Sequence, residues 1–305
     1  MKKTVGFLST MIFSLLMAQK DVQFTHFTYV QDFINPASAA FDKSYRTTVL
    51  VRQQWFDFSG APQTQLASFS MPYKNRFGLT AQLLHDKLGF ENNFSLTAGG
   101  AYFLPFTIGV NDYRLGIGFA GNFYVKRLEG SKLIYDDMTD PNGVFNDLTK
   151  VLGDANMGIS LGGKDFFFGT SMRNMIGVPK SKETIFKYNR NYYIFAIYKF
   201  KLNEHVDVIP NYYAKTNFQV WEHNIQVHGW FENAFMVGLN YRYKESIGML
   251  LGIKFFKHWE IAYGYDIITG TLNQASFGSH DIVLHYNVKP LPPKLPYIKS
   301  PRYFN

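Results

Sequence analysis

The feature that most restricts the fold is a two-residue alternation of apolar and polar side chains, which recurs along most of the chain. Near the C-terminus, for example, Ile282 and Leu284 point to one side of an extended chain and His285 points to the other. Successive strand residues face opposite sides of a sheet, so this pattern predicts β-strands. Repeated segments of about ten such residues are typical of membrane-spanning β-barrels.

The composition of the two faces favours a barrel over a soluble β-sandwich. Aromatic residues make up 18% of the chain and charged residues also 18%, where a soluble domain has about 25% charged residues. Several apolar stripes end in Tyr, Trp or Phe, as the lipid-facing side of a barrel requires. The opposite face is rich in small residues such as Gly248 and Gly264, which suit a crowded interior. A secreted sandwich, whose outer face would carry charges, is kept as an alternative.

The alternation predicts an all-β, single-domain barrel of about fourteen antiparallel strands over residues 46–288. If the first strand starts in the periplasm, the three longest connections, 127–155, 173–190 and 268–277, all lie outside the cell. Long outer loops and short periplasmic turns are typical of exported barrels. The predicted strands are 46–56, 63–72, 76–86, 91–103, 111–126, 156–161, 166–172, 191–201, 206–215, 220–228, 234–243, 246–256, 259–267 and 278–288.

Residues 1–18 have the organisation of a secretory signal peptide, with two lysines, an apolar stretch and a small residue at the end. We expect cleavage after Ala18. No later segment has the roughly 18 apolar residues of a membrane helix, so the exported chain does not span a bilayer as helices. Residues 19–45 precede the barrel and are long enough either to enter the lumen as a plug or to lie beneath it in the periplasm.

Residues 289–305 differ from the rest of the chain. They contain five of the twelve prolines and four basic residues, so they are expected to run extended instead of joining the sheet. The even strand number places this tail, like the N-terminus, in the periplasm. The composition fits a solvated tail and a docking peptide equally well.

No constellation of residues points to catalysis, a cofactor or a metal. The absence of Cys excludes disulfides, thiolate metal sites and a Cys nucleophile. Ser279, His280 and Asp281 are consecutive, and neighbouring strand residues face opposite sides, so they cannot converge as a triad. Residues 136–143 lack the spacing of a calcium loop. Basic residues are scattered singly, without the aromatic interleaving of a nucleic-acid surface, and no nucleic-acid partner is expected.

Three stretches carry a specific resemblance. They are Ile34-Asn35-Pro36-Ala37; the Arg52-Gln53-Gln54-Trp55 segment with Gly60-Ala61-Pro62; and Gly278-Ser279-His280-Asp281 with Ser300-Pro301-Arg302-Tyr303-Phe304. Together they resemble the PorP/SprF family, outer-membrane proteins of the type IX secretion and gliding machinery of Bacteroidetes. The resemblance spans the mature chain.

The resemblance implies a non-catalytic barrel in the outer membrane, surrounded by outer-membrane lipid. Its partners would be type IX components, namely the translocon, a periplasmic ring or a peptidoglycan-bound subunit, or a large secreted adhesin whose export it assists. A passive channel or hydrophobic-substrate transporter is the alternative function. Residues of the motifs and the tail are candidates for partner binding, with structural roles equally open: Asn35, Pro36, Arg52, Trp55, Gly60, Pro62, Lys294, Arg302, Tyr303 and Phe304.

Overall fold

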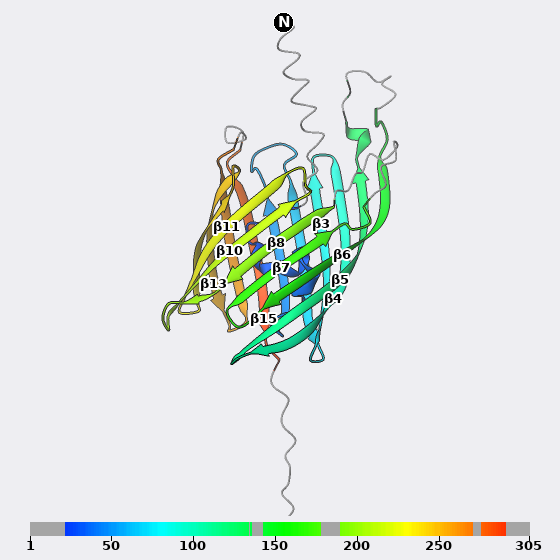
Figure 1. The fold of residues 1–305 in the computed structure, drawn as a ribbon. Helices are drawn as coiled ribbons and strands as arrows, with labels where there is room; N and C mark the ends of the chain where they lie inside the picture. The colour runs from blue at the N-terminus through cyan, green and yellow to red at the C-terminus, as the bar shows by residue number, and fades with distance from the viewer. Residues whose placement is uncertain (1–21, 134, 136–142, 178–189, 271–275, 291–305) are drawn as a thin grey trace, which may run out of the picture.

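The computed structural model describes residues 22–133, 135, 143–177, 190–270 and 276–290, and these residues form one antiparallel barrel (Figure 1). The strands are β1 (Tyr45–Gln53), β2 (Gln63–Tyr73), β3 (Phe77–Leu88), β4 (Glu91–Ile108), β5 (Asn111–Leu128), β6 (Leu148–Gly162), β7 (Phe166–Arg173), β8 (Asn191–Tyr198), β9 (Phe200–Lys201), β10 (Val206–Thr216), β11 (Trp221–Phe231), β12 (Phe235–Arg242), β13 (Ser246–Phe255), β14 (Trp259–Ile268) and β15 (Ser279–Val288).

The sheet closes on itself because β1 pairs with β15, and β10 pairs with both β8 and β11. β8 and β9 are two parts of one strand, interrupted at Lys199, and both pair with β10. The barrel therefore has fourteen strands. The predicted barrel of about fourteen antiparallel strands is confirmed, and each predicted strand overlaps one observed strand.

The two largest differences from the predicted strand bounds are in β6 and β4. β6 begins at Leu148 instead of residue 156, and β4 continues to Ile108 instead of ending at residue 103. The early part of β6 pairs with β5 from Leu148, opposite Leu128, although its own sequence alternates poorly. A paired neighbour extends a strand by backbone hydrogen bonds, which place no demand on side-chain pattern.

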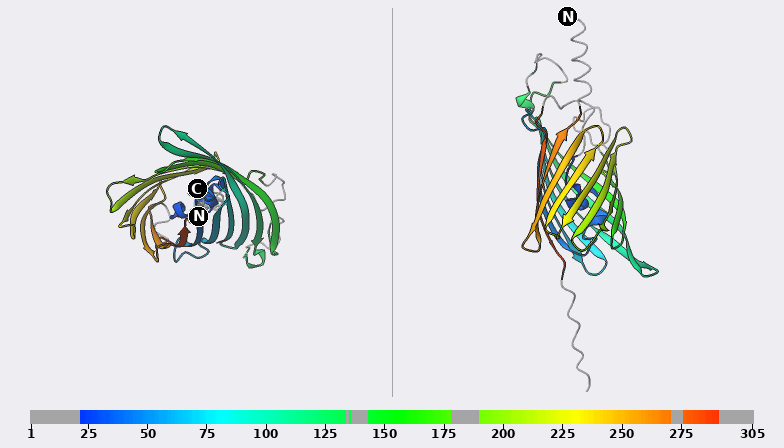
Figure 2. Two further views of the ribbon diagram at one scale, coloured as in Figure 1. Left: turned by 90° about the horizontal axis from the view of Figure 1, so that it is seen from below. Right: turned by 90° about the vertical axis from the view of Figure 1, so that its left-hand side faces the viewer.

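The connections differ between the two ends of the barrel. One end, called here the turn end, has only short links, such as 109–110 and 256–258. The other, the loop end, carries the links 129–147, 174–190 and 269–278, which correspond to the three predicted long loops. Each strand crosses between the two ends, as Figures 1 and 2 show.

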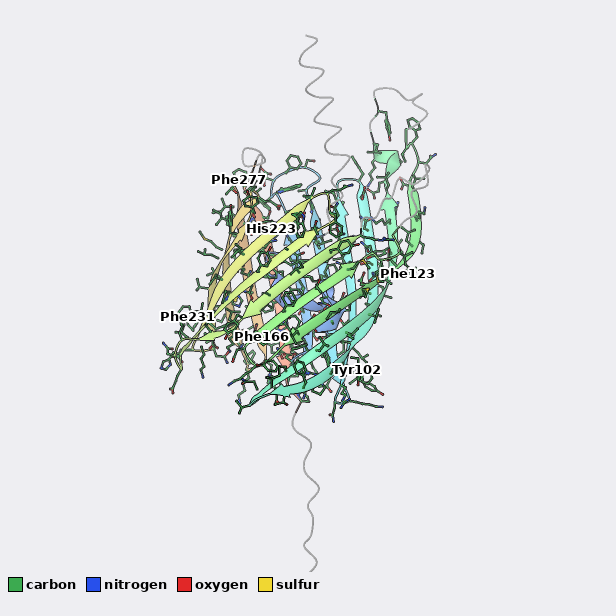
Figure 3. The ribbon with its side chains drawn as sticks, viewed as in Figure 1. Tyr102, Phe123, Phe166, His223, Phe231 and Phe277 are labelled. Atoms are coloured by element: carbon green, nitrogen blue, oxygen red, sulfur yellow. The ribbon has the colours of Figure 1, made fainter. Side chains whose placement is uncertain are left out.

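The outside of the barrel is apolar around its girth. Along β12, Phe235, Val237 and Leu239 point outward and are exposed, whereas Met236 and Asn240 point inward and are buried. Exposed aromatic rings lie near both ends of this surface, for example Phe277 at the loop end and Phe231 at the turn end, both labelled in Figure 3. An apolar band between aromatic rings is the lipid-facing surface of an outer-membrane barrel. No helix among the described residues is long and apolar enough to cross a membrane.

The interior is filled by the segment before β1. Residues 22–44, called here the plug, form three short helical turns inside the barrel: η1 (Phe27–Tyr29), α2 (Gln31–Ile34) and η2 (Pro36–Ser38) (Figure 2). Apolar plug side chains pack against inward-facing residues of the wall, and this contact is the hydrophobic core of the molecule. The plug residues of that core are Phe24, Phe27, Val30, Phe33 and Ile34.

Candidate functional site

The plug runs through the barrel from one end to the other. At the loop end, the Gln23 side-chain amide donates a hydrogen bond of 2.8 Å to Glu222, next to the start of β11. At the turn end, the Phe41 ring packs edge-on against Phe103 and Phe167, with centroid distances of 5.5 and 4.7 Å. The plug therefore contacts the wall along the whole lumen, and these contacts are the candidate site.

The upper part of the plug is held by a buried cluster of charges, called here the ionic clamp. It consists of Arg52 on β1, Asp266 on β14 and Asp281 on β15, each at most 1% exposed. The Arg52 guanidinium lies 2.8 Å from the Asp266 carboxylate and 3.5 Å from that of Asp281. Arg52 and Asp281 are direct cross-strand partners at the β1–β15 seam, so barrel closure brings them together.

Thr25 of the plug completes the ionic clamp. Its backbone N–H donates to Asp281 at 2.7 Å, and its hydroxyl donates to Asp266 at 2.7 Å. The same hydroxyl oxygen accepts a 2.6 Å hydrogen bond from Arg52. Buried charges are tolerated only when partners replace the lost water. Here the plug supplies part of that replacement, so the charges of the wall and the position of the plug depend on each other.

A second set of charges continues the cluster toward the loop end. Arg242 on β12 lies 3.5 Å from Asp266 and 3.2 Å from Glu245, and Lys215 lies 3.1 Å from Glu222. The side chain of Gln23 reaches both of these glutamates, as described above for Glu222 and at 3.4 Å for Glu245. The plug therefore enters the lumen between paired charges.

In the lower part of the plug, the uncharged side chain of Asn35 makes several of the hydrogen bonds. The Asn35 side-chain oxygen accepts from the N–H of Ala37 at 2.8 Å, which caps the turn that Pro36 begins. Its side-chain nitrogen donates to the backbone carbonyls of Ile159 and Thr170, at 3.0 and 3.3 Å, on β6 and β7. One side chain thus shapes the plug and joins it to two strands.

Glycines in the barrel wall leave room for the turn that Pro36 begins. A Cβ atom at Gly118 would lie 2.3 Å from the backbone nitrogen of Ala37, and one at Gly158 would lie 2.0 Å from the Asn35 side-chain oxygen. Both distances are far below contact, so only a residue without Cβ lets the plug backbone approach so closely. The inward glycines of β5 and β6 therefore form the seat of the plug.

Hydroxyl groups of the wall bind further plug atoms. The Asp32 carboxylate accepts hydrogen bonds from the hydroxyls of Ser68 and Thr80, at 2.7 and 2.8 Å, on β2 and β3. The hydroxyl of Ser171 donates to the carbonyl of Ile34 at 2.7 Å. Strands on both sides of the lumen thus hold the plug.

The predicted candidates fall into three groups. Asn35, Pro36 and Arg52 are buried in the lumen, where Asn35 and Arg52 hold the plug in the folded barrel. Trp55 and Gly60 lie in the loop-end link 54–62, Gly60 being exposed and Trp55 half-buried, and Pro62 is buried there. The four tail candidates lie outside the described residues: Lys294, Arg302, Tyr303 and Phe304.

Sequence reasoning did not identify Thr25, Asp266 or Gly118 as part of a site. For Asp281 the sequence offered two observations, its place in the Ser279-His280-Asp281 triplet and its place in a motif of the family resemblance, and neither predicted a contact with the plug. In the structure Asp281 faces the lumen, whereas His280 faces outward and contacts the Tyr263 hydroxyl at 2.7 Å. The sequence feature that could have predicted this cluster is the presence of one Arg and two Asp at inward-facing strand positions, because a charge inside a barrel needs a partner.

The described residues show no arrangement suited to a metal, since none of them form a group of three His, Asp or Glu side chains that could hold an ion. The candidate site consists of plug–wall contacts. It is built to hold a segment of chain in the lumen.

Comparison with known protein families and solved structures shows what this chain is similar to. The chain matches the family described as "Type IX secretion system membrane protein PorP/SprF" over residues 16–286. No curated protein sequence matches it. Similar solved structures include the Ralstonia pickettii toluene transporter TbuX, with 9% identity, a TM-score of 0.47 and coverage of 84% of this chain and 92% of that one. They also include Acinetobacter baumannii Omp33, with 6% identity, a TM-score of 0.45 and coverage of 81% and 99%.

The likeness to these two structures concerns the barrel fold alone. The family match covers most of the 305 residues and includes the plug, the ionic clamp and every strand up to β15. The chain belongs to the PorP/SprF family of type IX secretion system membrane proteins, and it is an outer-membrane β-barrel.

Proposed function

We propose that this protein is a non-enzymatic scaffold of the type IX secretion or gliding machinery. In this role it either holds a trans-envelope complex together or assists the export and surface anchoring of an adhesin-type cargo. The observation that carries the proposal, beside the family, is the filled lumen: the plug is bound to strands on all sides by the contacts described above. A barrel whose lumen is occupied in this way can bind partners through the surfaces at its loop end and its turn end.

The alternative is a passive channel or a transporter for hydrophobic substrates. A channel of this class needs an open path, which in larger barrels is left by an empty or loosely filled interior. Here the path would require Thr25 to leave the ionic clamp and Asn35 to leave its two strands. The plug contacts therefore favour the scaffold.

The proposed orientation puts the loop end outside the cell and the turn end in the periplasm, as in other exported barrels. The connections 129–147 and 174–190 would then meet the translocon or the cargo. The tail, 289–305, would meet a periplasmic ring or a peptidoglycan-bound subunit through its basic and proline-rich sequence.

The test is a pull-down of the tagged full chain from detergent-solubilised native membranes, with partners identified by mass spectrometry. We expect subunits of the secretion machinery or one giant adhesin, and the identity of the partner chooses between the two roles. A monomeric barrel without such partners would contradict the scaffold.

A matched variant that ends at residue 288 tests the tail. Since β15 ends at Val288, this variant retains all strands and the plug. We expect it to reach the membrane and to show the heat-dependent gel mobility of a folded barrel, while losing the periplasmic partner. Full recovery of that partner would exclude the tail as its binding segment.

A further inference from the structure

We propose that the amino terminus of the mature protein lies on the outer face of the membrane, at the loop end, with the plug threaded through the barrel. The two termini of the mature chain would then lie on opposite sides of the membrane. This inference rests on the proposed orientation of the barrel, which places the loop end outside.

The first described residues lie at the loop end. Besides its bonds to Glu222 and Glu245, Gln23 accepts a hydrogen bond of 3.5 Å from the side chain of Gln54. Glu222 stands at the start of β11, Glu245 lies in the link 243–245, and Gln54 follows the end of β1. All three positions belong to the loop end, so three separate parts of the barrel locate Gln23.

The other end of the plug lies at the turn end. The carbonyl of Ser38 accepts a 2.8 Å hydrogen bond from Arg46, at the start of β1. Phe41 packs on Phe103, next to the point where β4 leaves β3. From there the chain enters β1 at Tyr45, opposite Val288 at the end of β15. Residues 22–44 thus travel the length of the lumen before the first strand returns through the wall (Figures 1 and 2).

The chain before the plug is too short to turn back. The expected cleavage after Ala18 would leave three residues ahead of Val22, which span at most about 11 Å when fully extended. To return to the turn end, these residues would have to span the same height along the barrel axis as β1. The nine residues of β1 rise about 20–25 Å along that axis at a strand tilt near 40°. It would also need space in a lumen that the plug already fills. The mature amino terminus therefore stays at the mouth where the plug begins.

The number of times the chain passes from one end of the barrel to the other explains why the two termini would lie on opposite sides of the membrane. Fourteen strands alone return the chain to the side on which it started, which is why the sequence predicts both termini in the periplasm. The plug adds a fifteenth crossing through the lumen. The amino terminus then shares the outer face with the long loops, and the plug directly connects the outer mouth to the periplasmic mouth.

The native lysines allow a test on the unmodified protein. Lys20 lies in the short segment ahead of the plug, Lys132 is exposed in the link 129–147, and Lys294 and Lys299 lie in the tail. Cells are treated with a membrane-impermeant amine reagent, intact or after permeabilisation, and the labelled peptides are measured by mass spectrometry. We expect Lys20 and Lys132 to be labelled in intact cells, and the tail lysines at least tenfold more strongly after permeabilisation.

The outcomes separate this inference from the proposed orientation. Labelling of Lys132 but not Lys20 in intact cells, with Lys20 labelled after permeabilisation, would overturn the threading. Labelling of the tail in intact cells, with Lys132 and Lys20 both protected, would overturn the orientation and leave the threading intact. A Lys20→Arg variant, which must lose the label on the Lys20 side chain alone, confirms the assignment of the modified residue.

An epitope inserted after Gln19 gives an independent readout if Lys20 reacts poorly in both preparations. Antibody must bind this epitope on intact cells as well as it binds the same epitope placed in the link 129–147. Binding only after permeabilisation, with the loop epitope accessible throughout, would contradict the proposal. Heat-dependent gel mobility verifies that each tagged chain is a folded barrel.

Discussion

Arg52 shows how a single buried residue connects the wall to the plug. Its guanidinium binds Asp266 and Asp281 on two other strands, and it donates to Thr25 of the plug. A buried charge that loses its counter-charge is strongly unfavourable, because the carboxylates left behind cannot recover their hydration. The stability of the barrel should therefore depend on this residue far more than on any exposed ion pair.

We expect Arg52→Leu to lower the free energy of unfolding by about 3–5 kcal/mol, the range found when one partner of a buried ion pair is removed. The measurement is denaturant unfolding in detergent micelles, followed by tryptophan fluorescence. The control is Arg127→Leu, which breaks the exposed pair between Arg127 and Asp147 and should change the midpoint very little. Equal midpoints for the two variants would contradict a structural role of the ionic clamp.

The ion pair between Arg127 and Asp147 at the loop end should make the stability of this loop depend on pH. A hydrogen bond from Arg127, joined by bonds from Ser131, lowers the pKa of Asp147 from 3.8 to about 2. Because the folded pKa is the lower one, the contact stabilises the loop above pH 3.8 and is lost as the pH falls toward 2. In Arg127→Leu the pKa of Asp147 should rise toward 3.8, as followed by NMR of the carboxyl carbon. An unchanged titration would show that the contact is absent in solution.

At the scale of the element, the plug takes its shape from the wall. Its three turns are three or four residues long, and helices of this length are not stable alone. The packing of its apolar side chains and the hydrogen bonds to Asn35 and Asp32 hold it in place. The fit against β5 is close enough that one added methyl group in the wall should disturb it.

Gly118 and Gly121 on β5 form a matched pair for this prediction. A Cβ at Gly118 would meet the plug backbone at 2.3 Å, whereas one at Gly121 has nothing within 4 Å. We expect Gly118→Ala to destabilise the protein by about 1–3 kcal/mol through overpacking and to make the plug more accessible to protease. Gly121→Ala should behave like the parent protein in both assays. A normal stability and protease pattern for Gly118→Ala would contradict the seat described here.

The strands themselves were largely predictable, and the exceptions have a physical cause. All fourteen were located by alternation, because the side that faces lipid must be apolar at every second residue. The early part of β6 was missed, since it extends by backbone pairing with β5 and not by side-chain pattern. The plug segment has no such periodicity, and its path through the lumen followed from none of its local features.

In the molecule as a whole, the main feature is a lumen that the plug occupies. Fourteen strands enclose enough space for a segment of chain, and the plug occupies it with a hydrophobic core and two sets of polar contacts. The wall carries apolar residues such as Leu50 and Phe195 on its inner face, which suit contact with the plug and not with water.

We expect the purified protein in planar bilayers to show no stable conductance, because the plug closes the lumen. An internal deletion of residues 23–43 should either conduct or fold poorly, and heat-dependent gel mobility distinguishes the two. Only a folded deletion variant is compared with the parent. Large, stable channels formed by the parent protein would contradict the closed barrel and would favour the transport alternative.

The fold class and the position of each strand could be predicted from the amino-acid sequence, because alternation is a local property of the chain, and the motif residues around Asn35 and Arg52 were found through the family resemblance. Tertiary structure alone decided what the motifs do. Thr25 meets Asp266 across 241 positions and Asp281 across 256, so no local pattern marks these contacts. They form only when the barrel closes and β1 comes to lie beside β15, which converts motifs at opposite ends of the chain into one clamp on the plug.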